Sequence, residues 1–463
     1  MQRENSNRLR DMTSGSPAKH ILYFSIPLLL GNMLQQLYNM VDSWVVGNYV
    51  GDTALAAVGA AFPIIFLFVS MFIGLGIGAT VVVAQFYGAG DMERVRTAID
   101  TAYTAMMILA IPISLAGFFL AGPILHLMQL DEAAFGQAKL YMQIVSLGLV
   151  GSIGYNTNAG ILQGLGNSKT PLMFLSMATV INIVLDLLFV IVFRWDVVGV
   201  AVATLIGEWF SWVFGTIYIN RKYKDTFRIR PLHWMVDRRL LAQTIRIGLP
   251  AGIQNALVAV GIMAVYAKVN AYGYDFTAGF NVANKIDCFA FLPIQSIANA
   301  ATTYTGQNIG AGRMDRVPQG TRASMLMSIV WSVISAAVVI PLAGPMMWLF
   351  SKSPDVIAAG ELYLYWVMPG YILFTFIMVL GSIMRGAGES IVPLITTIVS
   401  VLLGRVLLCY LLDYYLGQQY MFGCFIGGWI IGAAIAIIYY LSGRWKRHGS
   451  VETEITGEIR QGE

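Results

Sequence analysis

The chain has 463 residues, of which 57% are hydrophobic and only 12% are charged, and its mean hydropathy is +0.68. Soluble globular proteins carry roughly 25% charged and roughly 45–50% apolar residues, and one water-facing domain of this length cannot bury the excess. The composition therefore excludes a soluble enzyme and indicates an all-α integral membrane protein. The net charge of +4 does not indicate nucleic-acid binding, because the basic residues lie between apolar stretches rather than in one patch.

Apolar stretches that are long enough to cross a bilayer recur along the whole chain. About 20 apolar residues in a helix cover a hydrocarbon layer of about 30 Å. The first stretch follows a basic leader and is too long for the core of a signal peptide, so we interpret it as a retained membrane helix. The twelve predicted transmembrane helices cover residues 21–47, 54–85, 97–121, 139–162, 171–193, 197–219, 244–270, 277–307, 323–343, 361–384, 391–412 and 421–443.

Lys and Arg are distributed unevenly between the predicted connections. If the chain starts in the cytoplasm and alternates sides, 22 of these residues lie at inner ends and four at outer ends. This bias predicts a protein of the cell (inner or plasma) membrane with both termini in the cytoplasm. The predicted parts are a cytoplasmic leader at 1–20, an N-lobe at 21–220, a cytoplasmic linker at 221–243, a C-lobe at 244–443 and a cytoplasmic tail at 444–463.

The two halves of the chain share motifs at one constant offset, which is the distance along the chain from Gln85 to Gln307. Chance does not keep one register over such a distance. The pairs are Gln-x-x-Gly-Ala-Gly at 85–90 and 307–312, Leu-Tyr at 140–141 and 362–363, and Gly-x-Gly-x-Ser-x-x-Pro-Leu at 164–172 and 386–394.

This repeat predicts two pseudo-symmetric six-helix lobes. Six spans per half is an even number, so both halves enter the membrane from the same side and enclose a central cavity, an arrangement typical of transporters. The repeated glycines are better explained as tight turns at helix ends than as phosphate loops, since neither copy follows a strand or carries the Lys-Ser/Thr of a nucleotide-binding loop. Transport would therefore draw on an ion gradient.

Four motifs together resemble the MATE (multidrug and toxic compound extrusion) family of transporters. They are the segment 27–42, the Gln-x-x-Gly-Ala-Gly turns, Asn182-Ile-Val-Leu-Asp186 and Gly-Val-Ala-Val-Ala-Thr at 199–204, and the resemblance extends over residues 12–443. It implies twelve helices in two lobes and export of small organic cations or amphipathic compounds in exchange for protons or sodium ions, without a further cofactor. The aspartate in the fifth span places the chain nearer the DinF-type than the NorM-type branch.

The resemblance also places an ion site in the first lobe, on Asp42, Asn182, Asp186 and Thr204, with a proton or a sodium ion as its occupant. Helical rise supports a common height for these residues. Asp42 and Asp186 each lie 15 residues after a proline at the inner start of a span, which is about 22 Å at 1.5 Å per residue. Thr204, eight residues into a descending span and roughly 12 Å from its outer end, lies close to the same level. In the second half, Ala264 or Val265 stands at the position of Asp42 and Leu408 at that of Asp186, so ion coupling is predicted in the first lobe.

Further polar and aromatic residues in the spans are candidates for the cavity wall or for substrate contact. Glu208 lies one turn from Thr204 and is either a cavity acid or the partner of a nearby backbone or hydroxyl group. For Arg405, a tie to helix-end carbonyls is favoured over substrate contact. The candidates are Gln35, Tyr38, Asn39, Tyr155, Glu208, Asn281, Lys285, Asp287 and Gln295.

The predicted protein is an ion-coupled exporter that acts as a monomer in the lipid bilayer, with small molecules and no nucleic acid as partners. It is not an enzyme, because the spans contain no catalytic constellation such as a Ser-His pair or His-Glu-x-x-His. The alternative within the same superfamily is a flippase of lipid-linked or other amphiphiles. Such a flippase would be expected to have a strongly cationic cavity, whereas the buried charges identified in the first lobe are acidic.

Overall fold

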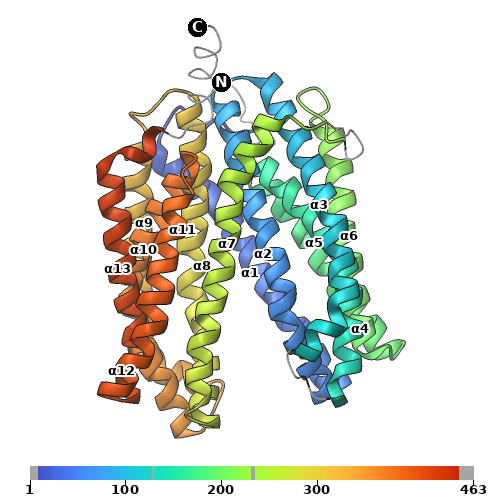
Figure 1. Cartoon of the computed structure of the whole chain (residues 1–463), viewed down its shortest axis with the longest axis vertical. Helices are drawn as coiled ribbons and strands as arrows, with labels where there is room; N and C mark the ends of the chain where they lie inside the picture. The colour runs from blue at the N-terminus through green and yellow to red at the C-terminus, as the bar shows by residue number, and fades with distance from the viewer. Residues whose placement is uncertain (1–8, 128–129, 131, 231–234, 448–463) are drawn as a thin grey trace. The chain divides into compact units, whose positions relative to one another are not determined.

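A computed structural model describes residues 9–127, 130, 132–230 and 235–447, and all regular secondary structure in these residues is helical (Figure 1). Parts of the predicted leader (1–8), linker (231–234) and tail (448–463) lie outside these residues. The main helices are α1 (Pro17–Val45), α2 (Asp52–Gly88), α3 (Met92–Leu127), α4 (Glu132–Gly164), α5 (Lys169–Leu187), α6 (Asp196–Lys222), α7 (Arg238–Asn270), α8 (Tyr274–Gly310), α9 (Val317–Trp348), α10 (Pro354–Gly386), α11 (Ile391–Thr397), α12 (Leu408–Leu416) and α13 (Gly423–Ser442).

Wider π-helical turns extend three of these helices. They cover Val46–Val50 after α1, Leu188–Val192 after α5, and Ile398–Leu407, which joins α11 to α12 in one continuous segment. The described residues therefore form twelve long helical segments, which confirms the predicted number of helices.

Nine of the described segments combine membrane-spanning length with strong hydropathy. The other three are α1, α4 and α8, which are 29, 33 and 37 residues long but carry more Asn, Gln, Ser and Thr. Polar side chains are costly in contact with lipid and usually face the interior of a helix bundle. The residues of functional interest are therefore expected on these three helices and on their immediate neighbours.

The helices form two compact units with the same internal packing. The first unit contains Pro27–Gly252, and the second contains Met12–Ile26 together with the described residues from Ile253 onward. In the first unit, α4 packs against α2, α3 and α6, and α5 packs against α6. In the second unit, α10 packs against α8, α9 and α13, and the π-helical turn after α11 packs against α13. The fourth helix of each unit is thus its central helix.

Individual hydrogen bonds and turns also recur at equivalent positions of the two halves. The Thr80 hydroxyl on α2 donates to a backbone carbonyl of α4 at 3.0 Å, and Thr302, its counterpart in the repeat, donates from α8 to a carbonyl of α10 at 3.2 Å. Gly90 and Gly312 have left-handed backbones with φ of 76° and 68°, a conformation that only glycine adopts readily. The Gly-Ala-Gly motifs therefore end α2 and α8 at tight turns, as predicted.

The border between the units differs from the predicted border between the lobes. Met12–Ile26 belong to the second unit because the Met12 backbone N–H donates to Gln307 Oε1 at 2.9 Å, and Arg316 donates to backbone carbonyls of the leader at 2.8 and 3.4 Å. Helix α1 therefore changes unit at Pro27, a residue that removes one backbone hydrogen bond from a helix interior. Helix α7 changes unit between Gly252 and Ile253.

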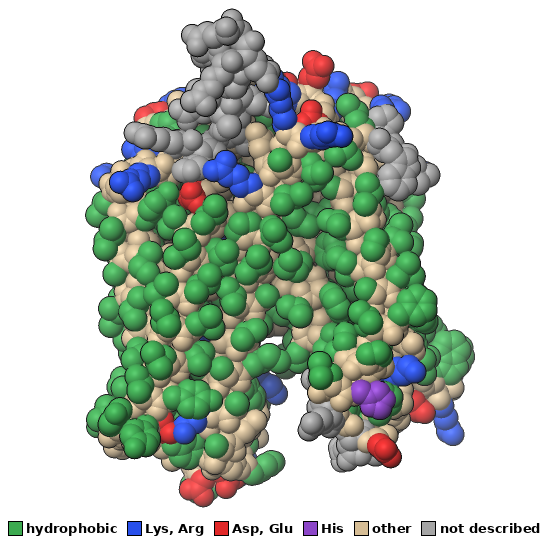
Figure 2. All heavy atoms as spheres, viewed as in Figure 1, with side chains coloured by type: hydrophobic (Ala, Val, Ile, Leu, Met, Phe, Trp, Pro, Cys, Tyr) green, Lys and Arg blue, Asp and Glu red, His purple; other side chains and the backbone are tan. Residues whose placement is uncertain are grey.

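Each unit has its own apolar core and exposes a broad apolar surface. In the first unit, Ala121, Met142 and Val200 are buried together from α3, α4 and α6. In the second unit, the ring of Phe422 stacks on that of Phe280 with centroids 5.6 Å apart. Figure 2 shows hydrophobic side chains over the middle of the visible face and charged side chains toward its ends. Such an apolar band matches the hydrocarbon layer of a bilayer.

Candidate functional site

Two aspartates of the first unit lie next to each other. Asp42 is near the end of α1 and Asp186 is on α5; their carboxyl groups interact, and the two residues are 9% and 0% exposed. Within the described residues, both oxygens of Asp186 and Oδ1 of Asp42 are buried and accept no hydrogen bond. Buried carboxylate oxygens are normally satisfied by donors, so this pair has free capacity for a proton or a cation.

Tyr38 connects this pair to α6. Its hydroxyl donates to Thr204 Oγ1 at 3.0 Å, and it also lies within interaction distance of Asp42, one turn further along α1. Tyr38 was predicted to line the cavity, but the structure places it among the residues of the predicted ion site. Three helices, α1, α5 and α6, therefore contribute polar groups to one cluster.

Asn182 lies one turn before Asp186 and faces α6. It is 2% exposed, and neither polar atom of its side chain has a hydrogen-bond partner among the described residues. A methyl group at Gly207 of α6 would lie 3.4 Å from Asn182 Cβ, so α5 and α6 are in close contact here. Its buried amide oxygen, one helical turn from Asp186, is a candidate neutral ligand atom for an ion held by the carboxylates.

Glu208 is partly buried between α6 and α4. Its carboxylate lies over Gly148, where an added Cβ would be 2.7 Å from Glu208 Oε2, and it interacts with Ser152. It also interacts electrostatically with Tyr38 and Asp42. Its buried Oε2 has no hydrogen-bond partner among the described residues, so both predicted roles of Glu208 stay open.

Tyr141 on α4 is a member of the cluster that the sequence reasoning missed. It is buried and interacts electrostatically with Asp42, Asp186 and Glu208. The signal was present in the sequence, because Tyr141 belongs to the Leu-Tyr pair that recurs at Tyr363. A tyrosine that faces acids in both units explains this part of the repeat.

The second unit contains a separate polar cluster around Asp287 on α8. Tyr371 donates to Asp287 Oδ1 at 2.7 Å and Tyr363 donates to Oδ2 at 3.2 Å, both from α10. Unlike Asp186, Asp287 therefore has a hydrogen-bond donor at each oxygen. This difference makes the pair in the first unit the stronger candidate for binding an ion.

Arg405 packs against aromatic rings. Its Cζ lies 4.5 Å from the ring centroid of Phe425 and 5.9 Å from that of Trp429, and its Nε has no hydrogen-bond partner among the described residues. No hydrogen bond from Arg405 to a helix-end carbonyl is found among the described residues, so the predicted tie stays a prediction. Aromatic faces attract the buried guanidinium, and Asp287 contributes electrostatically.

The other candidates do not join either cluster through a hydrogen bond within the described part of the chain. Gln35 and Lys285 are exposed, and Asn39, Asn281 and Gln295 are partly buried. The Tyr155 hydroxyl donates to the carbonyl of Pro171 at 3.4 Å and so connects α4 to the start of α5. Contact of these six residues with a substrate stays a prediction.

The chemistry of the first-unit cluster suits a hard monovalent ion or a proton. Among the described residues, no group of three or more His, Cys, Asp and Glu side chains could hold a metal ion. The cluster instead offers carboxylate, amide and hydroxyl oxygens, which are ligands of hard cations. In a transporter, such an ion would be a transported species rather than a resident cofactor.

Known proteins of similar sequence and structure point to one family. The MatE family model matches residues 27–188 and 250–411, one stretch in each half. The probable multidrug resistance protein YpnP of Bacillus subtilis is 31% identical over 437 residues, which cover 94% of this chain and 97% of that protein. The probable multidrug resistance protein NorM of Thermotoga maritima is 24% identical and covers 95% of this chain and 96% of its own length.

A solved structure shares the fold over nearly the whole chain. A MOP superfamily transporter from Pyrococcus furiosus matches with a TM-score of 0.87 and 24% identity, over 96% of this chain and 98% of that chain. Family model, relatives and fold therefore agree: the chain belongs to the MATE family of multidrug efflux proteins, and it is a membrane transporter rather than an enzyme.

Proposed function

We propose that this protein is a secondary active antiporter of the cell membrane, which exports small organic cations or amphipathic compounds in exchange for protons or sodium ions. The observation that carries the proposal is the contact between Asp42 and Asp186, two buried carboxyl groups with three oxygens that accept no hydrogen bond from the described residues. Charged groups at membrane depth are costly and usually functional.

A single bound cation would relieve the main strain of this pair. Two negative charges about 4 Å apart repel by about 4 kcal/mol at an effective dielectric constant of 20. A shared proton removes this repulsion, and so does a sodium ion, for which Asn182 Oδ1 and the Thr204 hydroxyl offer further oxygens. Hard cations prefer such oxygen ligands.

Relief of repulsion would couple ion binding to helix position. Asp42 and Tyr38 are on α1, whereas Asp186 and Thr204 are on α5 and α6, so the occupied and empty site favour different positions of α1 within the first unit. A substrate that binds only one of the two arrangements then exchanges with the ion, because each ligand shifts the same equilibrium. The names of the multidrug relatives support small molecules of varied structure as substrates.

Gradient-driven transport in proteoliposomes tests the proposal. A proton gradient or a sodium gradient is imposed separately, a panel of organic cations is added, and dissipation of the gradient is followed. We expect one of the two gradients to be dissipated by substrate, and Asp186→Asn to abolish this exchange while substrate binding persists. Dissipation of neither gradient by wild-type protein would refute antiport.

The matched control is Asp196→Asn, an exposed aspartate at the start of α6. This replacement removes the same charge outside the cluster and should leave transport unchanged. Wild-type exchange rates in Asp186→Asn would show that coupling lies elsewhere, and Glu208 and Asp287 would be the next acids to replace. Transbilayer movement of labelled lipid without exchange of any organic cation would favour the flippase alternative.

A further inference from the structure

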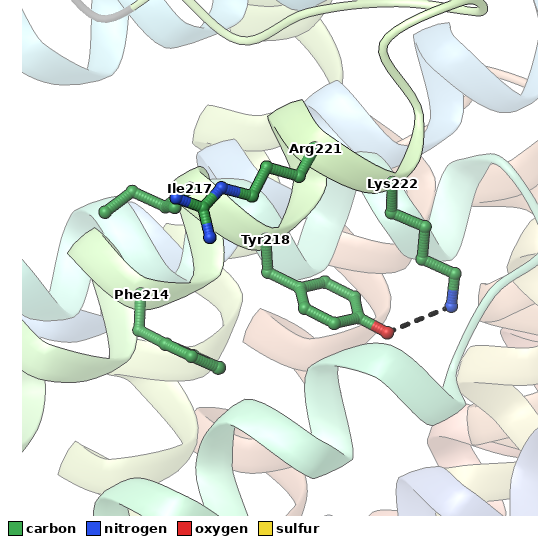
Figure 3. A pocket seen from close by; sticks show the side chains of 5 residues that line it. All are labelled: Phe214, Ile217, Tyr218, Arg221 and Lys222. Atoms are coloured by element: carbon green, nitrogen blue, oxygen red, sulfur yellow. Dashed lines mark hydrogen bonds between the residues drawn. The ribbon is translucent and has the colours of Figure 1, made fainter.

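A groove lies on the surface of the first unit, at the end of α6 that leads into the basic linker. It has a volume of ≈ 450 Å³ and is lined by Phe214, Ile217, Tyr218, Arg221 and Lys222, all from α6 (Figure 3). Ile217 is 47% exposed and Arg221 is exposed. The groove therefore opens onto the surroundings of this helix, and none of its lining residues belongs to the carboxylate cluster.

The apolar wall of the groove is a row of aromatic rings. Phe210, Phe214 and Tyr218 follow one another at intervals of four residues, with ring centroids 5.3 Å and 6.2 Å apart. Residues at this spacing lie on one face of a helix. Phe174 of α5 packs edge-on against Tyr218 at 5.6 Å and holds the row in place. The row forms a continuous apolar surface that runs along the membrane span.

Two basic side chains lie at the linker end of this apolar surface. Lys222 continues the same four-residue interval, and its Nζ donates to the Tyr218 hydroxyl at 3.1 Å and lies 5.2 Å from the centre of that ring (Figure 3). Arg221 lies beside it, one turn after Ile217. Among the described residues that line the groove, none is acidic. An apolar trough that ends in two positive charges is complementary to an amphiphile with a negative headgroup.

The fold itself does not require this arrangement. At the offset of the repeat, Phe210 and Phe214 correspond to Gly432 and Ala436, and Arg221 corresponds to Gly443. The second unit keeps a tyrosine and a cation, Tyr440 and Arg444, at the positions of Tyr218 and Lys222, but it lacks the two phenylalanines of the row and the first cation. The groove is a property of this sequence rather than of the repeated architecture.

We propose that this groove binds an anionic phospholipid from the cytoplasmic leaflet. The phosphate would lie between Arg221 and Lys222, and an acyl chain would follow Ile217 and Phe214 toward the middle of the bilayer. Lys and Arg side chains at the cytoplasmic ends of membrane helices attract anionic headgroups, and each contributes about 1 kcal/mol near such a surface. The inference depends on the predicted orientation of α6 but not on the proposed ion coupling.

Native mass spectrometry of the full chain in detergent tests the site. Phosphatidylglycerol and phosphatidylcholine are titrated separately, and bound lipid is counted. Wild-type protein should bind phosphatidylglycerol more tightly than phosphatidylcholine. In the double variant Arg221→Gln/Lys222→Gln, affinity for phosphatidylglycerol should fall about 30-fold, which is two charges at about 1 kcal/mol each.

Three further measurements separate the groove from general charge attraction. The control Lys224→Gln/Arg228→Gln removes two exposed charges of the same linker outside the groove and should keep wild-type affinity. Arg221→Lys should also keep it, because the charge remains. Glycerol 3-phosphate, the headgroup without acyl chains, should fail to displace the lipid.

Each opposite result would overturn the proposal. Equal binding of the two lipids would show no anion preference, and equal losses in the two double variants would show a diffuse field instead of a site. Displacement by glycerol 3-phosphate would show that the apolar row takes no part in binding.

Discussion

Replacement of the two contacting aspartates provides the sharpest test of the proposed ion site. The variants are Asp42→Asn, Asp186→Asn and the double variant. Either single change removes the repulsion between the carboxylates, which is about 4 kcal/mol for charges about 4 Å apart at an effective dielectric constant of 20. The new amide can also donate a hydrogen bond to the remaining carboxylate, and such a bond to a charged group contributes about 1.5–3 kcal/mol.

The two changes should therefore be strongly non-additive. The second replacement has no repulsion left to remove, so the stability gained by the double variant should fall short of the summed single gains by at least the repulsion itself, about 4 kcal/mol. A coupling ion at a concentration of one hundred times its dissociation constant should also raise the free energy of unfolding of the wild-type protein by about 2.7 kcal/mol. The same ion should stabilise the single variants much less.

Thermal unfolding in detergent measures both quantities. Stability is compared in sodium-free alkaline buffer, where the pair is empty, and again after sodium is added or the pH is lowered. Asp196→Asn is the control, because its exposed, left-handed position also accepts asparagine, and it should change stability by less than about 0.5 kcal/mol. Additive effects, with equal stabilisation of all variants by the ion, would refute a shared site.

Two further predictions concern packing and topology. Gly164→Ala places a Cβ 2.7 Å from the backbone oxygen of Thr80. The overpacking costs about 1–3 kcal/mol, which should outweigh the gain of about 1 kcal/mol in helix propensity and lower the Tm. Gly76→Ala should not lower the Tm, because the nearest atom to its Cβ would be 3.8 Å away. Equal Tm values for the two variants would contradict this packing. After replacement of the three native cysteines, thiol reagents should label Arg230→Cys and Tyr415→Cys from opposite sides of the membrane, and labelling from one side would contradict the twelve-span topology.

Much of the architecture could be predicted from the sequence because a bilayer imposes simple rules on a chain. Backbone groups in hydrocarbon must be satisfied internally, so long apolar stretches become helices, and their number follows from counting. The constant offset between the repeated motifs then predicts two equivalent units, and the Thr80 and Thr302 hydrogen bonds show this equivalence at the level of single atoms. The likeness to the DinF-type branch stays a prediction.

Helical rise also determines depth, which is how a common height for Asp42 and Asp186 follows from the sequence. The sequence does not determine how a helix is rotated about its axis or which helix faces it, because both depend on packing between segments that are distant in the chain. Tyr141 lies beside the acids because α4 is the central helix of the first unit, and Arg405 meets Phe425 and Trp429 because α13 packs against the π-helical turn after α11.

The border of the units illustrates the same limit. Hydropathy assigns the first span to the first lobe as a whole, because span and lobe are contiguous in the sequence. The tertiary structure instead joins Met12–Ile26 to the second unit through hydrogen bonds from Met12 to Gln307 and from Arg316 to the leader backbone. The sequence by itself thus determined which residues are helical and that Asp42 and Asp186 lie at a common height, while side-chain packing between segments far apart in the chain decided which residues meet.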